Sequence, residues 1–549
     1  MTSGETDPGD RARHGGEGRS ERVPAGRPAW ELLLPAVGAP ARRRGRALQE
    51  ALREAVRSGR LAAGTRLPST RDLAADLGVS RGLVTEAYEQ LTAEGYLRGE
   101  RGAGTWVSGT ARTGDRPGVG GARGANGTGG TGTGGAGTGG AGTGGAGTGG
   151  AAKEGTGRGE AGAGGTGTGG AGAGKASGMP GVRVDFRPGT PDLSLFPRSA
   201  WAAAQRSVLA RLPHRALGYP DPRGLPELRE ALAGMLARRR GVVADPERLV
   251  VCSGVAQAST LLGFVLRARG LRTVGVEDPG SPEHGRLFAS TGMETVWLPL
   301  DGEGLRPGPL AASGVRAVVV TPSHQFPSGI GWSAGRRAAL LDWARTVDGY
   351  VLEDDYDGDF RYDRAPVGAL QGLDPERVVY AGSVSKSLAP GLRLGWTLVP
   401  EELLGEVVER KRTMDLGNPV LDQAVLAEFV TRGGYDRQLR RCQRAYRERR
   451  DALLAALAEH LPGTGVSGIA AGLHVIARVP ARFGPPERFL ARSAGAGVAL
   501  RSLEEYGTAR PADGDVRLVI GYAHLTPSAI AEGVGLLAEA VGGGAGPAG

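Results

Sequence analysis

Three short stretches of this 549-residue chain combine residue types that could do chemistry, and the first contains a lysine. It reads Ser383-Val-Ser-Lys386-Ser, follows the apolar run Val378–Tyr380 and is followed by Arg393. An amine among small hydroxyl groups, with a permanent cation close by, suits a Schiff base with a phosphorylated aldehyde. Lysines after strands are also common as plain surface charges, so this stretch alone does not decide the chemistry.

The second stretch is acidic and also follows an apolar run. It contains Glu353, Asp354, Asp355, Tyr356 and Asp357. Carboxylates that cluster at a strand end often bind a metal ion, but no further His or carboxylate pattern supports a metal site here. The alternative is that one Asp pairs with a pyridine nitrogen, so that the ring acts as an electron sink, and that Tyr356 donates to the phenolic oxygen of that ring. The pyridine interpretation is favoured, and we expect no metal.

The third stretch, Ser253-Gly254-Val-Ala-Gln257, lies between the apolar run Leu249–Val251 and a predicted helix. A glycine turn that opens a helix presents free backbone N–H groups, which bind phosphate. Such turns are frequent, and this one gains weight because the acidic stretch and the lysine follow it in that order. Together the three stretches predict one site at the carboxyl edge of a sheet.

A sheet must position these stretches, and the sequence from about Val182 to Val541 predicts one. Short apolar runs alternate there with helical patterns of about 12–20 residues. Buried strands that alternate with helices predict an α/β body, with a largely parallel sheet covered on both faces. The predicted strands include Leu249–Val251, Thr273–Val276, Val315–Val320, Tyr350–Leu352 and Val378–Tyr380.

Glycine separates this body from a smaller folded part. The chain has 97 glycines, and 32 of them lie between Thr110 and Pro180, where no core can form. We therefore predict four regions. They are a disordered leader (1–28), a small head (29–109), a flexible Gly/Ala/Thr-rich linker (110–180) and the α/β body (181–545).

Composition also excludes several classes of protein. No apolar run reaches the roughly 18–20 residues that cross a bilayer, and the N-terminus lacks an apolar secretory segment, so we expect a cytoplasmic protein with no membrane partner. Cys252 and Cys442 are the only cysteines, too few for a disulfide framework or a cysteine-rich zinc module. The net charge of +9 permits a polyanionic partner without requiring one.

The head has the pattern of a winged helix-turn-helix. A glycine, Gly78, separates two short helical patterns, and a Gly-rich turn separates two short apolar runs that predict a wing. The start of the later helix would meet base edges in a major groove, where Arg81 could bind guanine. Solvated surface arginines on a small helical bundle are the alternative. The predicted elements are helices over Leu48–Ser58, after Ser69 and after Ser80, and wing strands at 96–98 and 105–107.

The head resembles the winged helix of GntR-type transcriptional regulators over about 60 residues, on the evidence of the string from Gly64 to Ser108. The helix lengths, the Pro-Ser-x-Arg start, the Ser-Arg pair and the Gly-rich wing all coincide. Between Trp30 and Thr110 there are 12 arginines and 9 acidic residues, a net charge of only +3, so we expect two heads to be needed for firm binding. Gly82 departs from the commoner Ser or Thr and offers no side chain. The resemblance implies double-stranded DNA as a partner, with contacts from Arg71, Ser80, Arg81, Gly82, Thr85 and Gly102.

The body resembles fold-type I pyridoxal-phosphate enzymes of the aspartate aminotransferase superfamily, and the whole chain resembles the MocR/GabR group of regulators. The shared markers are Thr321-Pro-Ser-His-Gln-Phe-Pro-Ser-Gly329, Glu353–Asp357 and Ser385–Arg393. The resemblance implies pyridoxal 5'-phosphate as cofactor and a homodimer. It implies that Lys386 forms the internal aldimine, that Asp354 pairs with the pyridine nitrogen and Tyr356 with the phenolic oxygen, and that Val255, Ala256, Ser383, Ser385 and Arg393 hold the phosphate.

Three positions depart from the aminotransferase pattern. Phe326 stands where aminotransferases place Asn, Ser281 where a Tyr often stacks on the cofactor, and Val519 where an Arg binds the substrate carboxylate. His284 is a candidate replacement for the stacking ring. Arg517 lies on the same strand face as Val519 by period-two alternation, so it is either the cation for a substrate or effector carboxylate or an ordinary strand-edge charge.

The resulting interpretation is a transcription factor that senses pyridoxal 5'-phosphate, alone or with an amino-acid or amine effector, and that transaminates slowly at most. An effector can act only through its differential affinity for two arrangements of the heads. A true aminotransferase with a DNA-tethering head is an alternative, because the lysine, the Asp and the phosphate cup are all present. A body that has lost its cofactor and only dimerises is the third.

Overall fold

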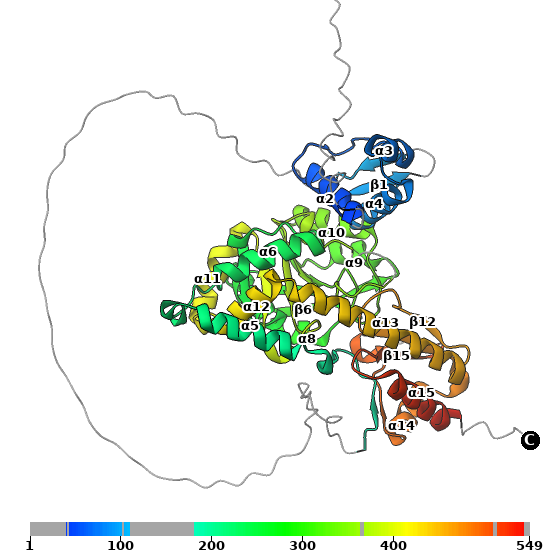
Figure 1. Ribbon diagram of the computed structural model, residues 1–549. Coiled ribbons are helices and arrows are strands. Elements are labelled where there is room, and N and C mark those ends of the chain that lie inside the picture. Colours follow the sequence, from blue (N-terminus) through cyan, green and yellow to red (C-terminus); the bar gives the residue numbers. More distant parts are fainter. Residues whose placement is uncertain are drawn as a thin grey trace, which may run out of the picture. The chain divides into compact units, whose positions relative to one another are not determined.

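The computed structural model describes residues 40, 43–100, 104–109, 181–362, 367–508 and 513–542 (Figure 1). The predicted leader (1–28) and linker (110–180) lie outside these ranges. Within them, no helix combines the length and the apolar character that crossing a membrane requires. The described residues form the predicted head and body.

The head contains a helix-turn-helix followed by a two-stranded wing. Two serines cap the last two helices: Ser69 Oγ accepts a hydrogen bond from the Asp72 N–H, and Ser80 Oγ accepts one from the Leu83 N–H. Gly78 takes a left-handed conformation, with φ of 61°, at the turn between them. The predicted elements are confirmed as α2 (Arg44–Arg57), α3 (Thr70–Leu77), α4 (Arg81–Glu94), β1 (Leu97–Glu100) and the antiparallel β2 (Gly104–Val107).

An eight-stranded sheet forms the centre of the body, in the order β4-β11-β10-β9-β8-β5-β6-β7. The strands from β10 to β6 in that order are parallel, whereas β11 is antiparallel to both of its neighbours and β7 is antiparallel to β6. The predicted, largely parallel sheet is thus confirmed. The strands are β4 (Leu249–Cys252), β5 (Thr273–Asp278), β6 (Glu294–Asp301), β7 (Gly304–Leu305), β8 (Ala317–Val320), β9 (Tyr350–Asp354), β10 (Val378–Ser383) and β11 (Gly395–Leu398).

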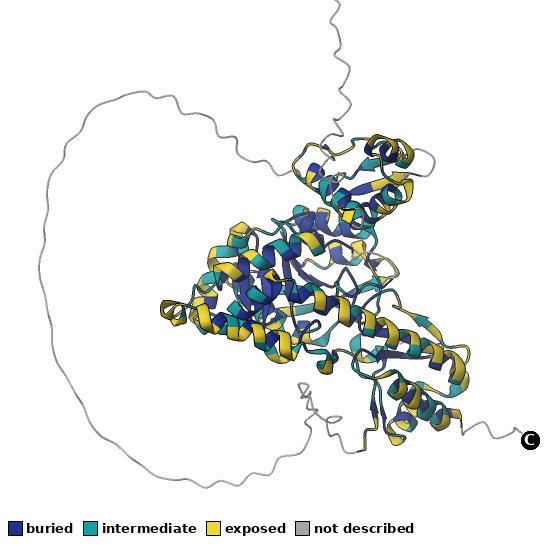
Figure 2. Cartoon of the chain, viewed as in Figure 1, coloured by how far each residue is buried: buried dark blue, intermediate teal, exposed yellow. Residues whose placement is uncertain are grey.

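Helices cover both faces of this sheet, as buried parallel strands require. In β4, Val250 packs into one apolar cluster, while Leu249 and Val251 pack into another on the opposite face. Figure 2 shows the buried strands in dark blue beneath helices whose outer residues are exposed. The covering helices are α5 (Arg198–Arg211), α6 (Pro226–Arg240), α7 (Val255–Ala268), α8 (Pro282–Ala289), α9 (Pro307–Ala312), α10 (Ala334–Thr346), α11 (Glu401–Asp415) and α12 (Val420–Thr431).

A smaller C-terminal part of the body is built on a second sheet. Its strands are antiparallel in the order β12-β13-β15, and a short parallel pair joins β14 to β3 from the beginning of the body. The long helix α13 leads from the large sheet to this part (Figure 1). The elements are β3 (Val184–Asp185), α13 (Gly434–His460), β12 (Gly465–Ser467), β13 (His474–Val479), α14 (Pro486–Gly495), β14 (Val498–Ala499), β15 (Val516–Gly521) and α15 (Pro527–Gly542).

Candidate functional site

The acidic stretch and the lysine stretch meet because their strands are neighbours. β9 and β10 are parallel, and Asp354 at the end of β9 is in register with Ala381, five residues before Lys386. Parallel strands deliver their carboxyl ends to one edge of the sheet, where a ligand can reach the residues that follow. β4, at the edge of the same sheet, delivers Gly254 and the start of α7.

The two carboxylates at the end of β9 differ in their partners. Asp355 accepts two hydrogen bonds from Arg240, of 2.6 and 2.9 Å, and a third from the Tyr380 hydroxyl at 2.6 Å. Asp354 accepts at Oδ2 from His284 Nε2 at 2.9 Å, while its buried Oδ1 has no hydrogen-bond partner among the described residues. Asp355 is therefore committed to the fold, and Asp354 keeps one oxygen for a ligand.

Lys386 is half-buried next to this pair. Its Nζ donates to the Gly189 carbonyl, which belongs to the segment after β3. Burial lowers the pKa of Lys386 below its ordinary value, although the nearby charge of Asp354 opposes the effect. A lowered pKa leaves more of the amine neutral, which is the form that attacks a carbonyl carbon.

The predicted phosphate cup is assembled from three segments. Gly254 has a φ of 90° and caps α7 without any side-chain hydrogen bond, so the first N–H groups of the helix, those of Val255 and Ala256, are not covered by a cap. A Cβ at Gly254 would lie 3.2 Å from a guanidinium nitrogen of Arg393, which places that cation beside the turn. The Ser383 hydroxyl accepts from the Ser385 N–H at 3.3 Å.

A buried polar network that was not predicted from the sequence supports this cup. Asn418 Nδ2 donates to Ser253 Oγ at 2.9 Å, and the fully buried Lys411 donates to Asn418 Oδ1 at 2.7 Å. Lys411 also pairs with Asp415, which accepts from Gln257 on α7. These contacts join α11 to the turn that precedes α7. No local pattern could have identified the contacts to Ser253 and Gln257, because these two connect residues more than 150 positions apart.

The family marker that contains His324 lies against Tyr356. His324 Nδ1 is 3.1 Å from the Tyr356 hydroxyl and 2.8 Å from Asp357 Oδ2. A Cβ at Gly472 would lie 2.2 Å from the His324 ring, so glycine is required there for the ring to fit. His324 therefore positions the tyrosine that was predicted to face the cofactor ring.

His324, Asp357 and His474 also form the one group in the described part of the chain whose ligand atoms, all within 4.8 Å of one another, could hold a metal ion. His324 Nδ1 is already bonded to Asp357, and His474 Nε2 is 3.0 Å from the Pro327 carbonyl oxygen. Burial lowers the pKa of His474 to about 3, so this ring stays neutral. These hydrogen bonds give the group a structural role, since they tie the marker segment to Asp357 and, through the Pro327 carbonyl, to His474.

Replacing His324 by Ala should lower the free energy of unfolding by about 1–3 kcal/mol, because it leaves the buried Asp357 carboxylate without its imidazole partner. Denaturant titration measures this cost, and His214→Ala, at an exposed position, is the control. Adding Asp357→Asn to His324→Ala should recover part of the loss, since no buried charge then remains. Equal stabilities of H324A and H214A would contradict this role.

The structure also shows the contacts of residues at the positions that depart from the aminotransferase pattern. The Phe326 ring makes edge-to-face contacts with Tyr356 and Tyr506, at centroid distances of 6.0 and 5.3 Å. Because the His284 imidazole is bonded to Asp354, it orients this carboxylate, a role that differs from the predicted stacking. An apolar, aromatic wall of Phe326 and Tyr506 thus lies beside Tyr356.

The arginine predicted to meet a substrate carboxylate lies elsewhere. Arg517 forms an ion pair with Asp513 and is in register with Arg478 near the start of β15, whereas the Gly521 end of that strand packs against Arg187 and Pro188, close to Gly189. Val519 is fully buried. The structure therefore does not bring Arg517 to Lys386, because its side chain is engaged at the opposite end of the strand.

Most of the predicted DNA-contacting residues lie at the start of α4, from its cap Ser80 to Thr85, whereas Arg71 lies on α3. Arg71, Ser80, Arg81 and Gly82 are exposed and Thr85 is half-buried, while Gly102 lies outside the described residues. Arg81 Nε is 3.4 Å from Thr70 Oγ1, a long contact that leaves the guanidinium at the surface. Open space surrounds the Gly82 Cα, so the DNA backbone can approach closely there.

Comparison with known proteins identifies the families to which both parts of the chain are similar. The family Aminotransferase class I and II matches residues 187–535, and the gntR family of bacterial regulatory proteins matches residues 45–107. The probable rhizopine catabolism regulatory protein MocR of Rhizobium meliloti is 32% identical over 506 residues, which cover 90% of this chain and 93% of MocR. The chain belongs to the MocR-type family of HTH-type transcriptional regulators. The pyridoxine biosynthesis regulator PdxR of Corynebacterium glutamicum is 31% identical to this MocR-type regulator, over 78% of this chain and 82% of PdxR.

Solved structures agree with the predicted fold of the body. LysN, an α-aminoadipate aminotransferase of Thermus thermophilus complexed with N-(5'-phosphopyridoxyl)-L-leucine, is 28% identical with a TM-score of 0.58, over 66% of this chain and 93% of LysN. The kynurenine aminotransferase of Pyrococcus horikoshii is 27% identical with a TM-score of 0.59, over 67% and 92% of the two chains. This MocR-type regulator therefore joins a GntR-type DNA-binding head to a fold-type I aminotransferase body.

Proposed function

We propose that this MocR-type regulator binds pyridoxal 5'-phosphate at Lys386 and reports it, alone or with an amine-bearing effector, to operator DNA. The observation that carries the proposal is the buried Asp354 Oδ1, which lacks a partner among the described residues while Asp355 is fully bonded. A buried oxygen without a donor is costly. The protonated nitrogen of a pyridine ring is a donor that would satisfy it.

The surrounding residues fit the rest of this cofactor. When bound, pyridoxal 5'-phosphate supplies an electron sink for the chemistry of amines. Burial raises the pKa of Tyr356 well above its ordinary value, so its hydroxyl stays protonated and can donate to the phenolic oxygen. The residues proposed to hold the group are Lys386, Asp354 and Tyr356 for the ring, and Val255, Ala256, Ser383, Ser385 and Arg393 for the phosphate.

The proposed effector is an amine recognised without an arginine clamp at the predicted position. Val519 is buried and Arg517 is paired with Asp513, so neither offers a cation to an α-carboxylate. Phe326 and Tyr506 instead present aromatic surface beside Tyr356. This combination disfavours turnover of ordinary α-amino acids and favours sensing of the cofactor itself or of an amine.

The head supplies the output of the proposed sensor. With two heads in a homodimer, a change in their relative arrangement alters the fit to paired half-sites. A ligand shifts that arrangement only as far as it binds one arrangement more tightly than the other. The test is operator binding by the full chain with and without pyridoxal 5'-phosphate and a panel of amines. An unchanged affinity and footprint under all conditions would defeat the sensing proposal.

Arg81→Ala should weaken operator binding by roughly tenfold, within the range expected for the loss of one base contact of about 1–3 kcal/mol. It should also relax the preference at one base pair of each half-site. Fluorescence anisotropy with operator variants measures both effects. Arg60→Ala is the control, because Arg60 is exposed after α2 and pairs with Ser58. Equal effects of the two substitutions would contradict a reading role for Arg81.

A catalytic aminotransferase is the second candidate, favoured by the presence of Lys386, Asp354 and Tyr356 in one place. Steady-state assays with several amino donors and 2-oxoacids distinguish it from the sensor. Brisk turnover would favour the enzyme, whereas slow half-reactions alone would fit the sensor.

A further inference from the structure

A dense row of arginines lies on α13, far along the sequence from the DNA-reading head. Between residues 437 and 447 this helix has five arginines and no acidic residue. All five are exposed, and Figure 2 shows exposed positions in yellow along the helix. Spacings of three and four residues place them on one side of the helix. The row consists of Arg437, Arg440, Arg441, Arg444 and Arg447.

Four of these arginines line a hollow in the surface of the body, which we call the arginine groove. It has a volume of about 520 Å³. Two further residues complete the lining. Gln443 lies within the row itself, and Arg361 comes from the segment that follows the acidic stretch after β9. The lining residues are Arg361, Arg437, Arg440, Gln443, Arg444 and Arg447.

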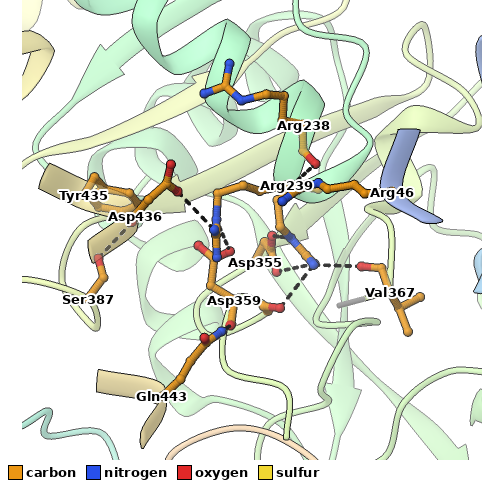
Figure 3. A network of polar contacts seen from close by, with 12 residues as sticks. Arg46, Arg238, Arg239, Asp355, Asp359, Val367, Ser387, Tyr435, Asp436 and Gln443 are labelled. Carbon is orange, nitrogen blue, oxygen red and sulfur yellow. Dashed lines mark hydrogen bonds and ion pairs between the residues drawn. The ribbon is translucent and has the colours of Figure 1, made fainter. Parts of the chain in front are cut away.

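The positive charge of the groove is not neutralised by the carboxylates beside it. Among the described residues, no acidic group lies within ion-pair distance of Arg437, Arg440, Arg444 or Arg447. The acidic side chains of Asp359 and Asp436 both pair with Arg239, at 2.9 and 3.1 Å (Figure 3). Gln443 Nε2 meets only the Asp359 backbone carbonyl, at 2.6 Å. The groove therefore holds a strong positive potential that is open to an anionic partner.

The length and chemistry of the row fit a chain of phosphates. Residues 437 and 447 are ten positions apart, about 15 Å along a helix. One strand of duplex DNA carries a phosphate about every 3.4 Å of axis, so about four phosphates span the same length. Guanidinium groups bind phosphate oxygens with two parallel hydrogen bonds. A single small anion would use only part of such a row.

We infer that the arginine groove binds the phosphate backbone of duplex DNA next to the sequence that the head reads. This inference rests on the proposed operator binding and adds a second contact surface to it. The head carries a net charge of only +3 between Trp30 and Thr110, so sequence-independent phosphate contacts on the body supply affinity that the head lacks. Such contacts raise the affinity without changing which bases are preferred.

The experiment measures how the affinity of the full chain for DNA depends on salt. The variant Arg440→Gln/Arg444→Gln removes two charges from the groove. It should reduce the slope of log affinity against log salt concentration by about two, for a duplex selected from a random pool and for an unselected duplex alike. Arg440→Lys/Arg444→Lys keeps both charges and should keep the slope.

The matched control removes two charges elsewhere on the body. Arg206→Gln/Arg488→Gln acts on exposed arginines of α5 and α14, neither of which lines the groove, and should leave the slope unchanged. Because all of these positions are exposed, unfolding midpoints should match the wild-type chain.

Each result decides the proposal. If R440Q/R444Q leaves the salt slope unchanged, the proposal is overturned, and a small anion or an acidic protein becomes the expected occupant of the groove. An equal reduction by the control pair also overturns it, because net charge alone then explains the effect. If Arg81→Ala weakens binding while the groove variant does not, operator binding stands and only the inference fails. If no duplex binds at all, the proposed function fails with it.

Discussion

Lys386→Ala is expected to abolish the visible absorption band that the full chain acquires with pyridoxal 5'-phosphate. The band requires a covalent imine, and the half-buried Lys386 is an amine that interacts electrostatically with Asp354 and lines the same pocket as Tyr356. Without it the cofactor is held only by non-covalent contacts and should be lost on dialysis. Absorbance spectroscopy before and after dialysis measures both effects.

The chain has only four lysines, so the control is simple. Lys175→Ala, in the segment predicted as linker, should keep the full band. If the band persists in K386A, another amine carries the aldehyde and the site proposed here is not the binding site. If it is absent from the wild-type chain at saturating cofactor, the third alternative, a body that only dimerises, is favoured.

The second large effect is expected in the head, at a buried ion pair between its first and last helices. Glu94 on α4 accepts from Arg53 Nε and from a second Arg53 nitrogen, at 2.7 and 2.6 Å, and from Gln90 at 2.7 Å. The side chains of Arg53 and Glu94 are only 7% and 1% exposed. Glu94→Gln should destabilise the head by about 3–5 kcal/mol, because it leaves a buried guanidinium without its carboxylate.

Hydrogen exchange of the α4 amides measures this loss locally, because native-state exchange reports the opening of individual segments. The matched control is Glu89→Gln, at an exposed position of the same helix. The double replacement Arg53→Met/Glu94→Leu should restore much of the stability, since an apolar pair of similar size carries no desolvation cost. Similar protection of α4 in E94Q and E89Q would contradict the argument.

The two predictions address separate halves of the proposed mechanism. K386A should prevent covalent binding of the cofactor and leave the head folded. E94Q should destabilise the DNA-binding head and leave the absorption band intact. Measuring band and DNA affinity in both variants therefore tests whether the ligand site and the head are coupled. Coupling requires that K386A also removes any effect of the cofactor on DNA affinity.

Much of the fold followed from local sequence pattern. The apolar runs that were predicted to be strands are strands in the structure, because a parallel strand buried on both faces must be apolar along its whole length. Ser69 and Ser80 became helix caps and Gly78 the turn between them, because these functions depend only on neighbouring backbone groups. The three chemical stretches met at one sheet edge for the same reason, since each follows a strand directly.

Tertiary structure decided which groups are free to act, because that depends on partners far away in the sequence. Asp354 and Asp355 are indistinguishable as neighbours in the sequence, and it is Arg240, 115 positions away, together with Tyr380 that commits Asp355 to the fold. His284 reaches Asp354 across 70 positions. Arg517 has the strand alternation expected of a site residue, yet Asp513 engages it. The arginine groove likewise exists because Arg239, on another helix, takes the carboxylates that would have neutralised it.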